Sequence, residues 1–360
     1  MSSVRRHGCR RMTSWLSLPM ILVIFGLYAR PLLESDKGGQ TRPDELIVEP
    51  EPVGSLEPLE PAEAKEDHFQ EVPKRCWVFT HLQKCGGETI KEIIFKRWRR
   101  RHVIYDSPEW KRGNDGAQQF GQRLTVESRW DVISGGYPEA LRESVGNACS
   151  WFTMFRDPIS RLVSAYFYCK AVSVDWLCAS DIVRARDVDL LGFARHWGNF
   201  GMRQFALKFV SPDEVVEFVK GGGVPWKGGD PLSLPGWYLL KMYLEHKAEM
   251  SGTNEAALLQ EMMHPVRDLV HHNFSAVGIL EEFDTTLELY NKALVMPGVD
   301  WVGEFNTTGK KNVNKKHTEK DTFLEQARMN TDIKDYISLD ILLYEHAVNV
   351  FREQVDRHGL

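Results

Sequence analysis

Residues 76–98 read CWVFTHLQKCGGETIKEIIFKRW, and this stretch decides the fold. The first five residues form a short apolar run with β-favouring side chains, which predicts a buried strand. Ile90, Ile93, Ile94 and Trp98 then recur at helical spacing and predict a helix with one buried face. A strand, a turn with two glycines and a helix aim backbone N–H groups and a helix dipole at an anion. The alternative is an ordinary strand-to-helix turn that contains a glycine pair.

A second strand-to-helix junction follows at residues 151–169, which read WFTMFRDPISRLVSAYFYC. Its first five residues predict a buried strand, and Asp157 with Pro158 predicts a helix start. Apolar residues three and four apart give this helix one core face: Ile159, Leu162, Val163 and Tyr166. Arg156 then lies between strand and helix, where a planar guanidinium suits a phosphate. The alternative is a surface ion pair of Asp157 with Arg156 or Arg161.

Net charge varies along the chain. Residues 1–29 carry +4, residues 30–74 carry −7, and residues 75–360 carry −2, which gives −5 for all 360 residues. A chain without a global basic field is not expected to bind nucleic acid through phosphate neutralisation. With 42% hydrophobic and 26% charged residues, the composition excludes a fibrous, wholly disordered or disulfide-scaffold protein.

The first 74 residues differ in composition from the rest. Residues 1–11 carry four arginines and no acid, and residues 12–29 carry no charge. We expect a cytoplasmic tail and a single transmembrane signal-anchor with the C-terminus in the lumen, because positive charge is retained in the cytoplasm. A cleaved signal peptide is the alternative. Residues 30–74 are rich in Pro and Glu, which predicts a disordered stem before a lumenal domain at 75–360. The short span favours a Golgi membrane.

Five of the six cysteines follow the predicted span, in what would be an oxidising lumen. Cys169 and Cys178 are separated by a short loop and form the disulfide that we expect. Because five is an odd number, at least one thiol stays free unless it pairs between chains. Asn273 and Asn306 begin glycosylation sequons that are usable only in that compartment.

The segments THLQKCGGETIKEI (80–93) and FRDPISRLVSAY (155–166) resemble two motifs of Golgi membrane-bound carbohydrate sulfotransferases. These are the 5′-phosphosulfate loop and the 3′-phosphate motif, and the likeness points to the heparan sulfate and uronyl 2-O-sulfotransferase branch. It extends over about 76–355, including a closing helix at 332–355. It implies an α/β fold related to the P-loop nucleotide-binding fold, with a central, mostly parallel sheet flanked by helices. The implied reaction moves a sulfuryl group from 3′-phosphoadenosine 5′-phosphosulfate (PAPS) to a glycan or sulfated polysaccharide hydroxyl.

The resemblance also implies roles for single residues. The residues that would hold the 5′-phosphosulfate are Lys84, Cys85, Gly86, Gly87, Glu88 and Thr89. Lys84 would neutralise charge on the bridging oxygen, so no metal is expected. The 3′-phosphate would contact Arg156 and Ser164, with Lys310 and Asn314 closing over the nucleotide. The acceptor would contact Trp197, Asn199 and Arg203.

The general base is not fixed by the resemblance. The 2-O-sulfotransferase branch carries a histidine base where this chain reads SGGY at 134–137, and Glu88 stands where the family loop has Thr. A hydroxyl nucleophile still needs its proton removed, and we expect Glu92 or His81 equally, then Glu88. The alternatives are a solvated carboxylate for Glu92 and a structural hydrogen-bonding role for His81.

Two rival functions remain open on the sequence. A catalytically silent glycan- or nucleotide-binding protein fits the missing histidine. A lumenal nucleotide kinase is poorly supported, because the loop lacks the G-x-x-x-x-G-K-[ST] spacing. The sequence leaves open the acceptor sugar, the hydroxyl modified and whether the chain forms a homo-oligomer.

Overall fold

The computed structural model describes residues 76–98, 102–104, 131–136, 149–172, 177–178, 184–224, 231–309 and 318–360. The predicted tail, signal-anchor and stem lie outside these ranges, as do Lys310 and Asn314. Within the described ranges, none of the helices combines the length and apolar character that a membrane span needs.

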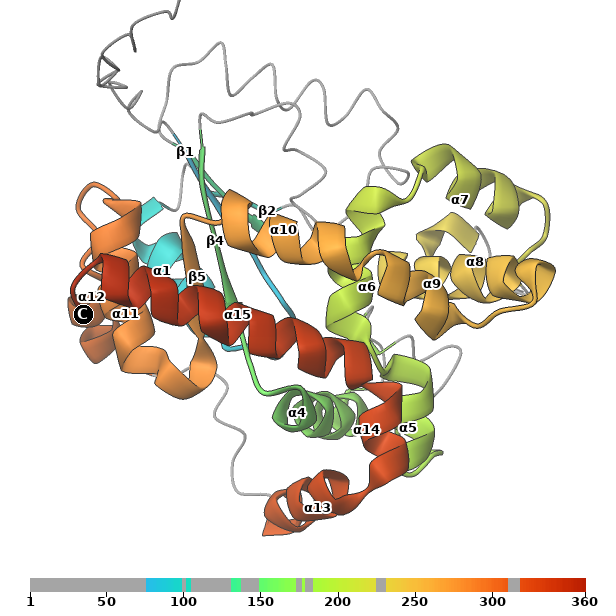
Figure 1. The fold of residues 1–360 in the computed structure, drawn as a ribbon. Helices are drawn as coiled ribbons and strands as arrows, with labels where there is room; N and C mark the ends of the chain where they lie inside the picture. The colour runs from blue at the N-terminus through green and yellow to red at the C-terminus, as the bar shows by residue number, and fades with distance from the viewer. Residues whose placement is uncertain are drawn as a thin grey trace, which may run out of the picture. The chain divides into compact units, whose positions relative to one another are not determined.

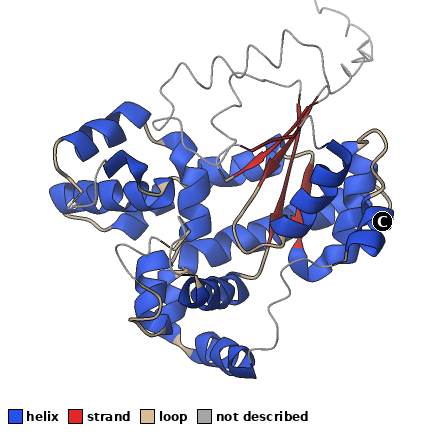
Figure 2. Cartoon of the chain, turned by 180° about the vertical axis from the view of Figure 1, so that it is seen from behind, coloured by secondary structure: helices blue, strands red, loops and turns tan. Residues whose placement is uncertain are grey.

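The centre of the fold is a five-stranded sheet in the order β2-β3-β1-β4-β5. Its strands are β1 (Cys76–Thr80), β2 (His102–Ile104), β3 (Asp131–Gly135), β4 (Cys149–Phe155) and β5 (Ala276–Ile279). Every neighbouring pair is parallel, and Figure 2 shows the strands lying among helices. The α/β class with a parallel central sheet is therefore confirmed.

Described helices follow β1, lie between β4 and β5, and follow β5, and they flank the sheet (Figure 1). The first group is α1 (Gly87–Trp98), α4 (Pro158–Ala171), α5 (Leu190–Trp197), α6 (Phe200–Ala206), η4 (Leu207–Phe209), α7 (Pro212–Lys220), η5 (Pro231–Ser233) and α8 (Gly236–Ser251). The second is α9 (Glu255–Glu261), α10 (Met263–Asn273), η6 (Leu280–Glu282), α11 (Phe283–Leu294), α12 (Trp301–Thr308), α13 (Thr318–Met329), α14 (Thr331–Tyr336) and α15 (Ser338–Arg357). Helix α12 packs against both α1 and α11, while α6, α10 and α15 pack together elsewhere on the fold.

The core runs through the sheet. Every residue of β1, β4 and β5 is buried, as expected for parallel strands with both faces covered. The predicted helix starting at Pro158 is present, and Asp157 caps it by accepting from the Ser160 N–H at 2.7 Å.

Two disulfides stabilise this arrangement. Cys169 and Cys178 are bonded, as the short loop between them predicts. Cys76 and Cys149 form a second bridge, which joins register partners at the beginning of β1 and β4. The sequence did not suggest this pair, because the two cysteines are 73 residues apart. Cys85 is the one free cysteine in the described part of the chain.

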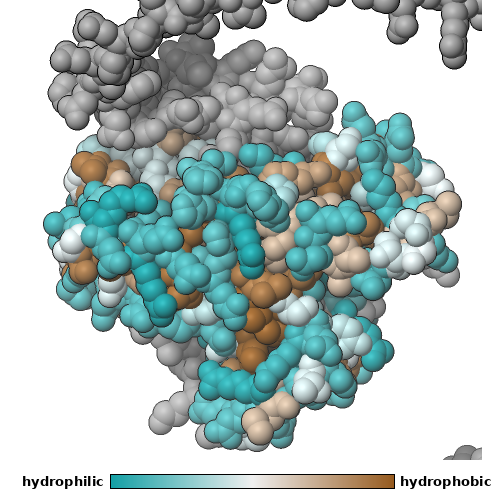
Figure 3. All heavy atoms as spheres, viewed as in Figure 1, coloured by the Kyte–Doolittle hydropathy of each residue, from teal (hydrophilic) through white to brown (hydrophobic). Residues whose placement is uncertain are grey.

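Helix α13 packs on α4 through aromatic rings. Phe323 lies 5.9 Å from Tyr166 and 5.3 Å from Phe167, measured between ring centroids. The face in Figure 3 is largely hydrophilic, with apolar side chains gathered in its lower middle, over α4. This packing joins the middle of α13 to the second half of α4.

Candidate active site

The segment 83–89, which ends the turn after β1 and includes the first three residues of α1, is called the glycine loop. Lys84 and Gly86 have φ angles of 65° and 81°, whereas Cys85 between them is not in the positive-φ region. Such alternation turns successive backbone N–H groups toward one side and is typical of anion-binding turns. The first turn of α1 follows at once and adds its own N–H groups and the positive end of its dipole.

Both glycines are required where they stand. Gly86 has a positive φ, and a Cβ there would lie 2.7 Å from Leu280 Cδ1. At Gly87 a Cβ would lie 2.0 Å from the His81 ring. The loop therefore passes close to its neighbours at two successive positions, which only glycine permits.

Arg156 joins the two sequence motifs in space. Its Nη1 donates to the Lys84 carbonyl oxygen at 3.0 Å, although the two residues are 72 positions apart. The contact forms because β1 and β4 are neighbouring parallel strands whose carboxyl ends meet at one edge of the sheet. The Lys84 ammonium lies 4.0 Å above the ring of Tyr168 on α4. Lys84 and Arg156 are both half-buried, so two cations stand beside the glycine loop.

Helix α13 contributes a third cation, which sequence reasoning missed. Lys320 is half-buried, and its pKa is lowered first by burial and then by the charge of Arg156, while Asp321 raises it. An anion bound near both side chains would offset the repulsion between their like charges. The only sequence signal was that Lys320 follows the basic run 310–316, which does not reveal its position against Arg156.

Helix α4 turns one face toward the loop. Arg161 on that face is near enough for its charge to lower the pKa of the Cys85 thiol, and Tyr168 on the same face lies with its ring 4.0 Å from the Lys84 ammonium. Ser164, at i+3 and i−4 from them, shares the face and is 4% exposed. Thr89 is also buried, and its N–H donates to the Gly86 carbonyl at 3.0 Å. The two side chains whose hydroxyls are predicted to bind the donor, Ser164 and Thr89, are therefore both buried.

The end of β5 completes this edge. Glu281 accepts from the Asp157 N–H at 3.1 Å and from the Tyr344 hydroxyl at 3.1 Å. Since Asp157 follows Arg156 directly, Glu281 fixes the junction that presents the guanidinium. Sequence patterns gave no reason to single out Glu281.

The surroundings of His81 fit the alternative interpretation of this residue, a structural hydrogen-bonding role. It is 2% exposed, its ring abuts Gly87, and its carbonyl accepts from Gln204 Nε2 at 3.0 Å. Burial holds the pKa of His81 well below its usual value, with smaller contributions from Lys91 and Lys84. A buried, uncharged imidazole behind the loop is poorly placed to take a proton from an acceptor hydroxyl.

The two acidic candidates lie at the beginning of α1. Glu88 is exposed and forms an ion pair with Lys91 at 2.6 Å. Glu92 is half-buried, one helical turn further along the same face. Glu92 is thus the more buried of the two carboxylates, while Glu88 is exposed and paired with Lys91.

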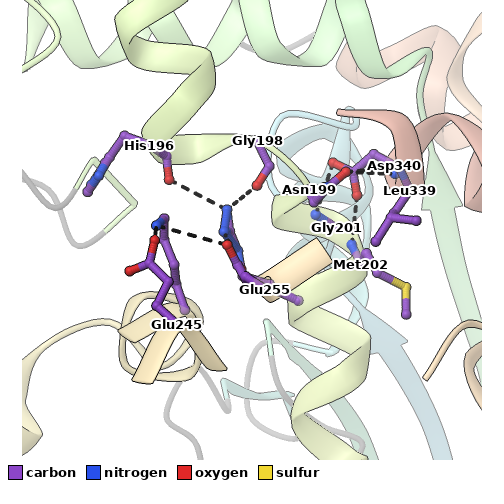
Figure 4. A network of polar contacts seen from close by, with 11 residues as sticks. His196, Gly198, Asn199, Gly201, Met202, Glu245, Glu255, Leu339 and Asp340 are labelled. Carbon is purple, nitrogen blue, oxygen red and sulfur yellow. Dashed lines mark hydrogen bonds and ion pairs between the residues drawn. The ribbon is translucent and has the colours of Figure 1, made fainter. Parts of the chain in front are cut away.

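The structure places all three predicted acceptor contacts in the core, so it does not bring them to an exposed surface where an acceptor would bind. Trp197, Asn199 and Arg203 are 1%, 7% and 1% exposed. Figure 4 shows the polar network to which Asn199 and Glu255 belong. Arg203 forms an ion pair with Glu255 at 3.2 Å and donates to the Gly198 carbonyl. The Asn199 side-chain oxygen accepts from the N–H groups of Leu339 and Asp340 at 3.0 and 3.2 Å.

The predicted modification sites occupy different positions. Asn306 is exposed on α12, whereas Asn273 is half-buried at the end of α10. Among the described residues, no group of three or more His, Cys, Asp or Glu side chains is arranged to hold a metal ion.

In comparisons with known proteins, no protein-family model matches this chain, and no curated protein matches it significantly.

Proposed function

We propose that the chain is a PAPS-dependent sulfotransferase that transfers a sulfuryl group to a hydroxyl of a glycan or polysaccharide acceptor. The observation that carries the proposal is the contact between Arg156 and the Lys84 carbonyl, which joins the two motifs at the carboxyl edge of β1 and β4. Open parallel sheets bind ligands at this edge. Lys84 and Arg156 at the glycine loop, with the charge of Lys320 near enough to Arg156 to be affected by it, supply the positive charge that a donor with phosphates at both ends needs.

Each of these residues has a role in the proposed reaction. The N–H groups of Gly86, Gly87 and Glu88 and the Thr89 hydroxyl hold the 5′-phosphosulfate. Lys84 stabilises the charge that grows on the bridging oxygen as its bond to sulfur breaks. Arg156, Ser164 and Lys320 hold the 3′-phosphate, the group that distinguishes this donor from ATP.

The acceptor hydroxyl loses its proton as its oxygen bonds to sulfur, and we assign Glu92 as the base. The support is its half-buried position near the beginning of α1, together with the burial of His81. The proton then resides on the Glu92 carboxyl, and adenosine 3′,5′-bisphosphate leaves. Glu92→Gln removes the acceptor of the proton and keeps the side-chain shape. We therefore expect transfer to fall about 100-fold or more, the typical contribution of a general base.

The control for Glu92→Gln is Glu88→Gln, on the same helix face. Single-turnover transfer and the Kd of adenosine 3′,5′-bisphosphate are measured for both variants. Transfer that is equally reduced in the two variants, or unchanged in Glu92→Gln, would remove Glu92 from the role of base.

The proposal includes the finer fold and the location. We place the chain in the P-loop-like sulfotransferase fold and in the Golgi membrane, as a single-pass type II protein with a lumenal catalytic domain. The bridges Cys76–Cys149 and Cys169–Cys178 support this location, because disulfides persist in oxidising compartments. Residues 12–29 supply the anchor and 30–74 the stem.

The activity is tested with the full chain in detergent, labelled PAPS and a panel of glycans, with and without EDTA. We expect labelled sulfate on at least one glycan, with transfer that survives EDTA. Transfer of phosphate from ATP that EDTA abolishes would favour a nucleotide kinase instead.

A second candidate is a silent glycan- or nucleotide-binding protein with the same site. The observation that favours it is the burial of His81, which leaves the site without an accessible histidine at that strand end. Tight binding of adenosine 3′,5′-bisphosphate with no transfer to any glycan would support this candidate over the enzyme.

A further inference from the structure

One side-chain amide joins the carboxyl ends of two strands beside the glycine loop. Gln204 Nε2, near the end of α6, donates to the His81 carbonyl at 3.0 Å and to the Gly136 carbonyl. His81 directly follows β1 and Gly136 directly follows β3, and these two strands are neighbours in the sheet. The amide NH2 has two donors, and the two strand ends use both of them. Gln204 is 4% exposed, so this contact satisfies carbonyls that water does not reach.

His81 is held through its backbone and through its ring. Its N–H donates to the Gly135 carbonyl at 2.7 Å, and its carbonyl accepts from Gln204. Its ring is stacked on Phe79 of β1, with 5.8 Å between the ring centroids. These contacts fix His81 relative to the sheet.

The His81 ring in turn contacts the glycine loop at two positions. Gln83 Nε2 hydrogen-bonds His81 Nδ1 at 3.4 Å. The ring also packs so closely on Gly87 that a Cβ there would lie 2.0 Å from His81 Cδ2. Because the Gly87 N–H is one of the groups that we propose to bind the 5′-phosphosulfate, a shift of this ring would move part of the proposed donor site.

The helix that carries Gln204 is itself anchored. At the beginning of α6, the N–H groups of Gly201 and Met202 donate to the Asp340 carboxylate at 3.3 and 2.7 Å (Figure 4). Asp340 also forms a buried ion pair with Arg161 of α4. Contacts with α4 and α15 therefore set the position from which Gln204 reaches the strand ends.

We propose that Gln204 is a positioning residue, which through His81 holds the glycine loop in its anion-binding conformation before the donor arrives. The inference rests on the proposed function for the identity of the anion, and on the contacts alone for the position of the loop. Lys84 has a φ of 65°, and such a conformation persists only where surrounding contacts impose it. A loop fixed in advance binds more tightly, because less ordering is required on binding.

The chain offers a matched control for Gln204. Gln354 on α15 is also 4% exposed, and it donates to the Phe274 carbonyl at 3.1 Å and accepts from the Val277 N–H at 2.8 Å. These groups lie at the beginning of β5, which is the opposite edge of the parallel sheet from the glycine loop. Gln204→Met and Gln354→Met each keep the length of the side chain and remove its hydrogen bonds to the backbone.

The first test measures amide hydrogen exchange in the full chain without ligand. Two amides report on the loop: the His81 N–H, which donates to Gly135, and the Thr89 N–H, which donates to the Gly86 carbonyl at 3.0 Å. We expect both to exchange about tenfold faster in Gln204→Met and to match wild type in Gln354→Met, where the Val277 amide exchanges faster instead. Wild-type protection of His81 and Thr89 in Gln204→Met would overturn the proposal.

The second test measures the donor. We expect both variants to lower the thermal midpoint, but only Gln204→Met to raise the Kd of adenosine 3′,5′-bisphosphate and the KM for PAPS, by about tenfold, with kcat at saturating donor within about twofold of wild type. An unchanged Kd in Gln204→Met, or a Kd that rises equally in both variants, would overturn the positioning role. A wild type that binds no nucleotide would contradict the proposed function, and the exchange experiment would still decide whether Gln204 holds the loop.

A milder variant keeps the proposal testable if Gln204→Met does not fold. Gln83→Met, at a half-buried position, removes only the hydrogen bond between the loop and the His81 ring. We expect exchange at Thr89 and the Kd of adenosine 3′,5′-bisphosphate to rise about threefold in this variant. Wild-type values for both would show that the ring does not hold the loop, which would overturn the proposal.

Discussion

Gly86 shows how far the loop depends on one backbone position. Its φ of 81° lies in the left-handed region, and Leu280 stands 2.7 Å from where a Cβ would be. Gly222, after α7, has a φ of 82° and open space around the same position. The two glycines therefore share one backbone requirement and differ in their surroundings.

Replacing each glycine by alanine separates the two effects. We expect both variants to lose about 1–2 kcal/mol of unfolding free energy from the backbone. Gly86→Ala should lose about 1–3 kcal/mol more from overpacking against Leu280. Urea unfolding of the two variants measures the difference, and equal losses would show that the loop adapts to a side chain.

Residue roles were predictable where they depend on neighbours in sequence. The glycine pair, Arg156 and the Asp157 cap each follow from a local pattern that the structure reproduces. The burial of Asn199 and Arg203 was not predictable, because their partners Asp340 and Glu255 are 141 and 52 residues away. A polar residue in a motif-like segment looks the same whether it faces a ligand or a distant helix.

At the scale of elements, α6 and α15 cap each other. Asp340, in the first turn of α15, accepts from two N–H groups of α6, and Asn199, before α6, accepts from two N–H groups of α15. Helix starts leave such N–H groups without intrahelical partners, so the exchange satisfies both. Asn199 also has a φ of 53°, which asparagine tolerates better than most residues.

Asn199→Ala should destabilise the fold by about 2 kcal/mol or more, because it removes a buried cap and places alanine in a strained conformation. The matched control is Asn330→Ala. It removes the part-buried side-chain oxygen that accepts from the Ile333 N–H and caps α14. Chemical unfolding of both variants gives the comparison. A loss no larger for Asn199 than for Asn330 would contradict the importance of the reciprocal cap.

The same contact explains an error in the predicted closing helix. The sequence suggested one helix over 332–355, whereas the structure has α14 and α15 with a break at Ile337, whose φ and ψ are −115° and 15°. The break allows α15 to begin where its first N–H groups can donate to the side-chain oxygen of Asn199. Local periodicity cannot show such a break, since apolar spacing continues through it.

At the scale of the whole molecule, two histidines link stability to pH, the buried His81 and the half-buried His196. Burial is the largest cause of a lowered pKa for both His81 and His196, and it lowers that of His196 to about 3. Both have an unfolded value near 6.5, so the unfolded chain takes up protons first as the pH falls. Their contribution to stability is complete above pH 6.5 and is lost below it.

We therefore expect the unfolding free energy to fall between pH 6.5 and pH 4 by up to about 1.4 kcal/mol per pH unit for each histidine. His196→Gln should make this slope shallower. His264→Gln, at an exposed side chain, should leave it unchanged. Chemical unfolding curves measured across this pH range give the slope of the unfolding free energy for each variant. Identical slopes in wild type and His196→Gln would contradict the argument.

The class of the fold was predictable, because the alternation of buried strands and amphipathic helices in 76–98 and 151–169 determines a parallel α/β sheet. The Cys76–Cys149 bridge and the place of α13 were not, because both depend on which strands and helices become neighbours. Lys320 comes within the influence of the Arg156 charge because α13 packs on α4. The proposed role of Lys320 therefore could not be predicted from a local sequence pattern.

The central claim is that Arg156 and the glycine loop form one site for a nucleotide with a 3′-phosphate. Calorimetry of adenosine 3′,5′-bisphosphate and adenosine 5′-monophosphate binding to wild type, Arg156→Ala and the exposed control Arg195→Ala tests it most directly. Loss of a charged hydrogen bond predicts a Kd about 10- to 100-fold higher for the bisphosphate in Arg156→Ala, with little change for the monophosphate or in Arg195→Ala. An unchanged bisphosphate Kd in Arg156→Ala would contradict the account.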